Sequence, residues 1–463
     1  MTSSLQDLLR ERSGEQFALH EQYLNGQMVR VLKTLGFDRN YVRAQGPYLY
    51  DDKGERYLDL LSGFGVFALG RNHPTVVRFL REALEAELPS LVQLDASLLA
   101  GVLAERFLAT MPGDLGKVFF ANSGAEAVES AIKFARCHTR RAGLAFCESG
   151  FHGLTLGALS LNGDEVFRAG FGPLLPEAHR IPFDDLEALE RVLSRRDIAA
   201  FFVEPIQGHG VNVPSDDYLR EAARLCRKYG TLFVADEIQT GLGRTGRMWA
   251  VEHWGVEPDM LLSAKALSGG FAPIGAVAMR RPIFDSLFSS IVRAPVHGST
   301  FAKNNLAMAA GLATLGVIRE ENLVENAAKL GEALLDDFRA MVDRYDFVHA
   351  VRGKGLMQAI EFAPPDTVKA RMTWKALDTA QSGLFSQLVI VPLFHEHRIL
   401  TQTASHHHAV VKLLPPLVIS EADRAWIVGA MNEVVGETQK IGGAIWDLGK
   451  RLAAAALRAK TGR

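Results

Sequence analysis

The sequence has few cysteines, no long apolar run and almost no net charge. Its three cysteines, Cys137, Cys147 and Cys226, lack the paired spacing of a disulfide framework, so we expect free thiols in a reducing cytoplasm. No apolar run approaches the ~20 residues of a membrane-spanning helix, and the first residues lack the apolar core of a signal peptide. A formal net charge of −2 gives no basis for binding nucleic acid or an anionic membrane.

Glycine is abundant, with 42 among 463 residues, which suits an α/β protein with many tight strand-to-helix turns. From about Thr75 to Glu320, strand-like runs alternate with helical stretches. The runs at 117–122, 198–205 and 231–237 are continuously apolar, as in parallel strands covered on both faces. The order strand, helix, strand predicts an α/β fold with a mainly parallel sheet in a large domain, followed by a smaller α+β domain.

Three regions are predicted along the chain. Residues 1–74 form an N-terminal segment that joins the small domain, with helix over the first ~40 residues and two short strands within 46–63. Residues 75–330 form the large domain, and residues 331–463 form the small domain with an additional C-terminal helix. That helix is indicated by Ile441, Ile445, Leu448 and Leu452 at helical spacing, in a basic segment. It could pack on its own subunit or lie on a membrane surface.

Three residues of the large domain are candidates for chemistry. Ser123 and Glu126 fit a capping box, and a helix N-terminus with small residues can bind phosphate through its N–H groups; the alternative is merely a well-capped helix. Asp236 ends an apolar strand, where open α/β sheets bind ligands, although it could simply cap a turn. Lys265 lies among apolar neighbours, which lowers the pKa of an amine and favours Schiff-base chemistry; the alternative is a lysine that extends to the surface.

Two further patterns carry less weight. Gly241, Gly243 and Gly246 match a dinucleotide-binding fingerprint, but they are separated from the preceding strand and no helix opens at Gly246, so we reject that interpretation. The segment 394–413 contains five histidines, yet it lacks the spacing of a zinc site and no cysteine lies nearby. We therefore expect an ordinary loop and no metal there.

The pieces NSGAEAVESAIKFAR, FHG, VEPIQG, ADEIQTGLGRTG, SAKALSGG, HGSTF, VRGKGLM and PPLVIS follow one another along the chain. In this order they resemble the class III (ω-amino acid type) aminotransferases, which use pyridoxal 5′-phosphate (PLP) on a type I fold. The resemblance covers about residues 40–435. It implies a PLP-dependent aminotransferase and favours the chemical interpretations of Ser123, Asp236 and Lys265.

The resemblance also implies roles for residues around the PLP ring. Lys265 would bind PLP covalently as a Schiff base and then act as general base and acid. Asp236 would pair with the protonated pyridine nitrogen, so that the ring accepts electrons from the substrate. Gln239 would hydrogen-bond the phenolic oxygen. The other residues implied near the ring are Ile238 on one face, Phe151 on the other, His152 beside it, and Glu204.

The PLP phosphate would be held at the start of the helix that follows Asn122. The resemblance implies Ser123, Gly124 and Ala125 as its ligands, together with Thr300 from a neighbouring subunit. A threonine contributed across subunits implies a homodimer whose active sites lie at the interface.

Two positions depart from the pattern of many family members. Where those members have a glutamate after QG and an arginine before the Pro-Pro pair, this chain has His209 and Lys412. Lysine cannot make the planar bidentate contact by which arginine binds an α-carboxylate. We therefore hypothesise an acceptor without an α-carboxylate, such as an amine-derived or lipid-like aldehyde. The alternative is that Lys412 does the work of the arginine more weakly.

The resulting prediction is a transaminase that moves an amino group from an amine or a glutamate-like amino acid to an aldehyde or ketone. Aminomutases, racemases and decarboxylases share this fold and this cofactor machinery, so they remain the alternative. A non-catalytic binding protein would be expected to lack Lys265 or Asp236, and both are present.

Overall fold

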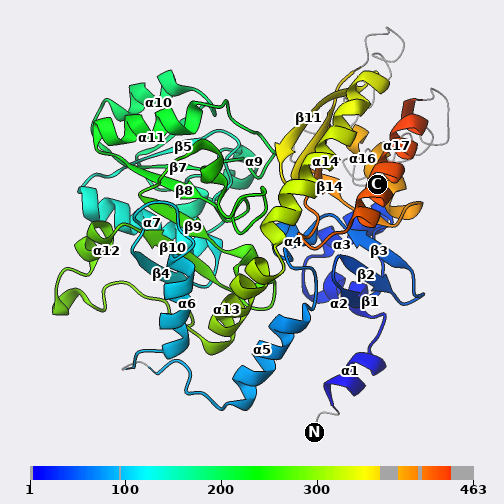
Figure 1. Ribbon diagram of the computed structural model, residues 1–463, viewed down its shortest axis with the longest axis horizontal. Coiled ribbons are helices and arrows are strands. Elements are labelled where there is room, and N and C mark those ends of the chain that lie inside the picture. Colours follow the sequence, from blue (N-terminus) through cyan, green and yellow to red (C-terminus); the bar gives the residue numbers. More distant parts are fainter. Residues whose placement is uncertain (1–3, 93–94, 365–383, 405–408, 440–463) are drawn as a thin grey trace.

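The computed structural model describes residues 4–92, 95–364, 384–404 and 409–439. Its largest sheet has seven strands in the order β4–β10–β9–β8–β7–β5–β6 (Figure 1). Only β10 runs antiparallel to its neighbours, so the mainly parallel sheet that the sequence predicts is confirmed. The strands are β4 (Lys117–Ala121), β5 (Gly143–Cys147), β6 (Ala178–Ile181), β7 (Ile198–Val203), β8 (Leu232–Asp236), β9 (Met260–Ser263) and β10 (Gly275–Met279).

Helices cover both faces of this sheet. Phe201 and Phe233 belong to the apolar cluster that includes α10 (Leu186–Leu193) and α11 (Tyr218–Tyr229). Their neighbours in sequence, Phe202 and Val234, belong to a second cluster that includes α7 (Gly124–Thr139). Successive side chains of a strand point to opposite faces, and both faces are buried here. This explains why the central strands are apolar throughout rather than alternating.

Further helices surround the sheet and lead to the smaller unit. α13 packs against α5, α6 and η2. α14, the long helix that the sequence predicts after Glu320, follows α13 and leads to the smaller unit (Figure 1). These elements are α5 (Pro74–Glu85), α6 (Leu98–Leu108), α8 (Leu156–Leu159), α9 (Glu165–Arg168), η1 (Ala250–Trp254), η2 (Lys265–Ser268), α12 (Arg281–Leu287), η3 (Ile291–Arg293), α13 (Asn305–Glu320) and α14 (Leu323–Arg344).

The smaller unit contains a four-stranded sheet in the order β11–β12–β15–β14. α14 packs on β11 and β12, while α16 packs on β15 and on α17, which gives the α+β arrangement that the sequence predicts. The elements are β11 (Val348–Lys354), β12 (Met357–Phe362), α16 (Leu384–His395), β14 (Gln402–Thr403), β15 (Val410–Leu413) and α17 (Glu421–Gln439). Among the helices of the described ranges, none is both long and apolar enough to cross a bilayer.

The N-terminal segment lies beside this smaller unit (Figure 1). β3 pairs in parallel with β13 (Ile399–Leu400), and the hairpin β2–β3 is the pair of strands that the sequence predicts. The helix predicted for the first residues is divided into three, and Asn25 starts the third by accepting a hydrogen bond from the Met28 N–H. The elements are α1 (Leu5–Glu11), α2 (Gln16–Tyr23), α3 (Gly26–Leu35), β1 (Tyr41–Gln45), β2 (Tyr48–Asp51), β3 (Arg56–Asp59) and α4 (Ser62–Gly65).

The predicted domain boundaries at residues 74 and 330 stay a prediction. The C-terminal stretch with Ile441, Ile445, Leu448 and Leu452 lies outside the described residues, so its predicted helix is left as an expectation.

Candidate active site

A cavity of about 830 Å³ lies at the carboxyl edge of the large sheet. β4, β5, β7, β8 and β9 run in the same direction, so the segments that follow them meet at one edge. The cavity is lined by every predicted site residue except Thr300: Ser123, Gly124, Ala125, Phe151, His152, Glu204, His209, Asp236, Ile238, Gln239, Lys265 and Lys412. The parallel strands therefore bring together residues from five separate stretches of sequence.

Asp236 is the last residue of β8 and is 3% exposed. Its carboxylate accepts hydrogen bonds from His152 Nδ1 at 2.7 Å and from the Ile238 N–H at 3.1 Å. Burial disfavours a charged imidazole, but the hydrogen bond and charge of Asp236, with the charge of Glu204, outweigh this and raise the pKa of His152. The two hydrogen bonds therefore fix the buried Asp236 carboxylate at one place on the sheet edge.

Lys265 begins η2, directly after β9, and its side chain lines the cavity. It makes no hydrogen bond or ion pair within the part of the chain that the structure describes. Burial lowers the pKa of its amine, against the opposing effect of the carboxylates of Glu204 and Asp236. The residue also has a left-handed backbone, with φ at 37°, a conformation that is costly for a residue with a side chain. The fold thus holds a free amine in the cavity.

The N-terminus of α7 forms another wall. Ser123 Oγ accepts a hydrogen bond from the Glu126 N–H at 3.1 Å, as the capping box predicts. The second half of the box differs, because the Glu126 carboxylate binds the N–H of Asn122 at 2.7 Å rather than that of Ser123. A Cβ on Gly124 would lie 2.9 Å from Ile238 Cδ1, so a side chain there would crowd the wall. The first-turn N–H groups lack acceptors within the helix and can bind an anion.

Glu204 and an aromatic cluster line the next part of the cavity. The Glu204 carboxylate accepts hydrogen bonds from the N–H groups of Phe151 at 2.9 Å and Gly208 at 2.7 Å. Burial raises the pKa of this carboxyl. The ring of His209 stacks on Phe151 with centroids 5.1 Å apart, and Phe167 meets Phe151 edge-on at 5.4 Å. One wall is therefore a cluster of three rings.

Lys412 closes the cavity from β15 of the smaller sheet. Its amine donates hydrogen bonds to the Gly208 carbonyl oxygen at 2.5 Å and to Gln239 Oε1 at 2.6 Å. Gln239 Nε2 in turn donates to the Phe64 carbonyl oxygen at 3.0 Å. Burial lowers the pKa of Lys412 to about 7. The lysine that replaces the expected arginine therefore contacts two uncharged acceptors.

Thr300 is the predicted residue that the structure does not bring to this cavity. It is exposed and lines a separate cavity of about 980 Å³. Its neighbour Ser299 accepts a hydrogen bond from Asn122 Nδ2 at 2.6 Å, which ties this segment to the start of α7. The contact of Thr300 with the cofactor across a subunit interface stays a prediction.

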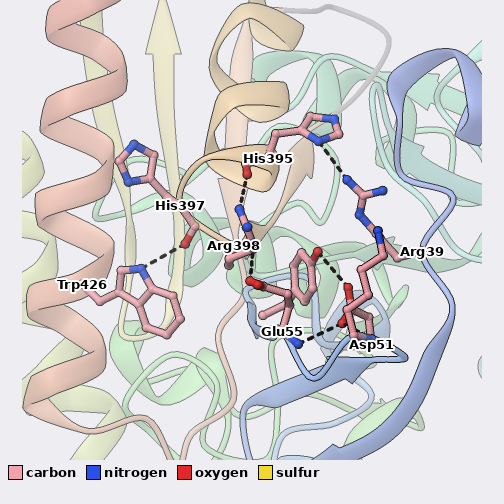
Figure 2. A network of polar contacts seen from close by, with 9 residues as sticks. Arg39, Asp51, Glu55, His395, His397, Arg398 and Trp426 are labelled. Atoms are coloured by element: carbon pink, nitrogen blue, oxygen red, sulfur yellow. Dashed lines mark hydrogen bonds and ion pairs between the residues drawn. The ribbon is translucent and has the colours of Figure 1, made fainter.

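The two patterns of low weight have ordinary structural surroundings. Residues from Gly241 to Gly246 form turns, and no helix opens at Gly246. His395 contacts the Arg39 guanidinium through Nδ1 at 3.2 Å and the Leu35 carbonyl oxygen through Nε2 at 3.2 Å, as part of the polar network in Figure 2. His397 contributes its carbonyl oxygen to the Trp426 indole. His406, His407 and His408 lie outside the described residues.

Several lining residues were missed from the sequence. They include Phe64, Val66 and Phe167, with Gln402 and Thr403 on β14. None belongs to one of the quoted motifs, and each reaches the cavity through a contact between distant parts of the chain. The amphipathic pattern around Phe167 is indistinguishable from that of an ordinary short surface helix.

Known proteins similar to this chain share its architecture. Residues 33–435 match the family described as aminotransferase class-III. The aminotransferase PigE of Serratia sp. is 37% identical over 93% of this chain's residues. The match covers 54% of PigE, so this chain spans about half the length of that relative. The solved ornithine aminotransferase of Toxoplasma gondii is 31% identical, with a TM-score of 0.80, covering 94% of this chain and 98% of that one. An amine transaminase from an uncultivated Pseudomonas species is 29% identical, with a TM-score of 0.74. The match covers 86% of this chain and 94% of the transaminase.

The family match spans most of the chain, and the solved relatives share its large parallel sheet and its smaller unit. The resemblance read from the sequence motifs is therefore confirmed. The chain belongs to the class III aminotransferase family, whose cofactor is pyridoxal 5′-phosphate.

Proposed function

We propose that this chain is a PLP-dependent transaminase that moves an amino group from an amine or glutamate-like donor to an aldehyde or ketone. The observation that carries the proposal is the meeting of Lys265, Asp236 and the α7 N-terminus in one cavity. The proposed acceptor lacks an α-carboxylate and is apolar.

The residues around the cavity fit PLP by their chemistry. Lys265 provides an amine with no other partner among the described residues, and Asp236 provides a buried carboxylate for a cationic ring nitrogen. The first turn of α7 provides N–H donors for a phosphate. Gly124 leaves room that a Cβ would fill against Ile238. When bound, PLP supplies a cationic ring that withdraws electrons from the substrate carbon.

The chain's own residues then have separate tasks. Lys265 would hold the cofactor and, once displaced by the substrate amine, move the proton of the substrate carbon at its Nζ. Its lowered pKa helps because more of the amine is unprotonated near neutral pH. Asp236, oriented by His152, would keep the ring nitrogen protonated. Ile238 and Phe151 would hold the ring between apolar surfaces and exclude water.

The substrate side of the cavity supports the choice of acceptor. Its described lining contains two lysines and no arginine, so it offers no planar bidentate contact for a carboxylate. The rings of Phe151, Phe167 and His209 offer an apolar wall instead. Relatives include a protein named an amine transaminase, which agrees with a donor or acceptor of this kind.

We also propose a cytoplasmic homodimer. The segment before Thr300 exposes apolar side chains, with Ile291 at 93% and Val292 at 85% exposed, and a second subunit would cover them. The free thiols of Cys137, Cys147 and Cys226 support a reducing compartment.

The test is a pair of half-reactions followed by the visible absorbance of bound PLP. An alkylamine or glutamate added alone should convert the cofactor to its amine form, and an apolar aldehyde should then restore it. A racemase, aminomutase or decarboxylase would turn over one substrate without needing the second. Failure of every donor to convert the cofactor would rule out the transaminase proposal.

A further inference from the structure

Lys412 has a buried amine that is hydrogen-bonded only to uncharged groups within the described residues. It is 3% exposed, and its amine lies between the Gly208 carbonyl oxygen and Gln239 Oε1. Buried lysines normally pair with a carboxylate, so this arrangement needs an explanation other than stability.

The pKa of the Lys412 amine is lowered to about 7, chiefly because the amine is buried. The charges of Lys265 and Arg244 act in the same direction as burial, and the charge of Glu204 acts against them. Two N–H groups of the amine are already used by Gly208 and Gln239, and only the protonated form has a third. Little donor capacity is left for a substrate carboxylate.

Lys412 also determines how the Gln239 amide lies. Lysine is a donor only, so it contacts the amide oxygen, and the amide nitrogen then donates to the Phe64 carbonyl oxygen. This leaves the second N–H of Gln239 for the cavity that it lines. The same amine holds the Gly208 carbonyl, which follows the Glu204 segment. Lys412 therefore links the segments that follow β7 and β8 directly, through Gly208 and Gln239. It links the segment that follows β3 indirectly, through the hydrogen bond from Gln239 to Phe64.

We propose that Lys412 is a positioning residue that orients Gln239 and Gly208 around the cofactor, and not a receptor for a substrate carboxylate. This inference rests on the proposed function, because it takes the cavity to be the PLP site. It predicts that loss of Lys412 weakens PLP binding and affects donors with and without a carboxylate equally.

The experiment is a double-mutant cycle of Lys412→Met and Gln239→Leu, read out by PLP binding. Equilibrium dialysis of the apoprotein gives the PLP dissociation constant. Each single variant should raise this constant about tenfold. The double variant should raise it by clearly less than the product of the two single effects, because both remove the contact between Lys412 and Gln239. Lys354→Met, on a strand of the same sheet, is the matched control and should leave it unchanged.

The kinetic arm compares glutamate with butylamine as amino donors. In Lys412→Met the ratio of their KM values should equal that of the wild type. Lys412→Gln keeps an N–H donor and should recover part of the PLP affinity, which also provides a folded variant if the methionine substitution unfolds the protein.

Three results would overturn the positioning role. The first is an unchanged PLP dissociation constant in Lys412→Met, and the second is additive effects of Lys412→Met and Gln239→Leu. The third is an increase in KM confined to glutamate, which would make Lys412 a carboxylate receptor. A wild-type protein that binds PLP but transaminates neither donor contradicts the proposed function, while the binding cycle still decides the role of Lys412.

Discussion

Charged side chains have different partners in the polar network of Figure 2 and in the cavity of the large sheet. In the network of Figure 2, Asp51 accepts hydrogen bonds from the N–H groups of Lys53 and Glu55, and Arg398 pairs with the Glu55 carboxylate at 2.8 Å. In the cavity, Lys265 has no such partner among the described residues, and Lys412 contacts only neutral acceptors. The paired groups hold segments together, whereas the two cavity lysines, whose amines are buried and form no ion pair among the described residues, have lowered pKa values.

The histidines of the two regions also differ in their surroundings. His152 is buried against Asp236, and its pKa is raised. His395 lies between a guanidinium and a carbonyl, in a position that fixes α16 against the segment after α3. The histidine of the candidate site is therefore distinguished by its buried carboxylate partner and not by the number of histidines in its segment.

The largest effect should follow removal of the free amine. Lys265→Ala should lower turnover by roughly 10³-fold or more, because the proton-transfer group is lost. It should also abolish the visible absorbance of lysine-bound PLP, which a spectrum of the purified protein measures. Lys354→Ala, outside the cavity, serves as control. A variant that keeps both the absorbance and the activity would disprove the central assignment.

Next comes a direct comparison of two buried aspartates. Asp236→Asn should lower kcat by about 10²–10³-fold, because the charge that holds a cationic ring nitrogen is lost. Asp51→Asn should leave kcat unchanged but cost about 1–2 kcal/mol of unfolding free energy. The oxygen that accepts from the Lys53 and Glu55 N–H groups loses its charge, and the Tyr57 hydroxyl faces an amide N–H in place of an oxygen. Steady-state kinetics and urea unfolding measure the two effects. Equal losses of kcat in both variants would remove the distinction between the regions.

A smaller effect is expected at the aromatic wall. Phe167→Ala should lower kcat/KM for a long apolar aldehyde about tenfold, because apolar contact with the substrate is lost. The kcat/KM for a short aldehyde should be nearly unchanged. For the long aldehyde, the kcat/KM of Phe167→Leu should lie between those of the wild type and Phe167→Ala. If both aldehydes lose the same factor, the ring cluster supports the cofactor and does not select the substrate.

The smallest effect concerns the pH dependence of stability. Because the pKa of Lys412 falls from 10.5 to about 7 on folding, the unfolded chain binds the extra proton between these values. Its contribution therefore makes the wild type more stable as pH rises from about 7 towards 10, by at most a few kcal/mol. Urea unfolding at several pH values measures this rise in the free energy of unfolding. Lys412→Met should lose the contribution of Lys412 to the rise, whereas Lys354→Met should keep it. An identical slope in Lys412→Met would mean that the amine is not desolvated.

The sequence by itself determined the main elements and the core of the candidate site. Continuous apolar runs predict the buried parallel strands because such strands are covered on both faces. Motif order then singled out Lys265, Asp236 and Ser123. Each lies at or within two residues of the carboxyl end of a strand, so their meeting at one sheet edge follows from the parallel arrangement. The direction of β10 was not predictable from its residues, since a buried antiparallel strand has the same composition.

Only the tertiary structure decided which distant residues meet. Phe64 and Phe167 reach the cavity, Lys412 reaches Gln239, and Arg39 reaches His395 through contacts that no local pattern encodes. The physical reason is that a hydrogen bond or a pKa depends on what surrounds a group after the chain has folded. The sequence could name the residue that departs from the family at position 412, but its partners became visible only in the fold.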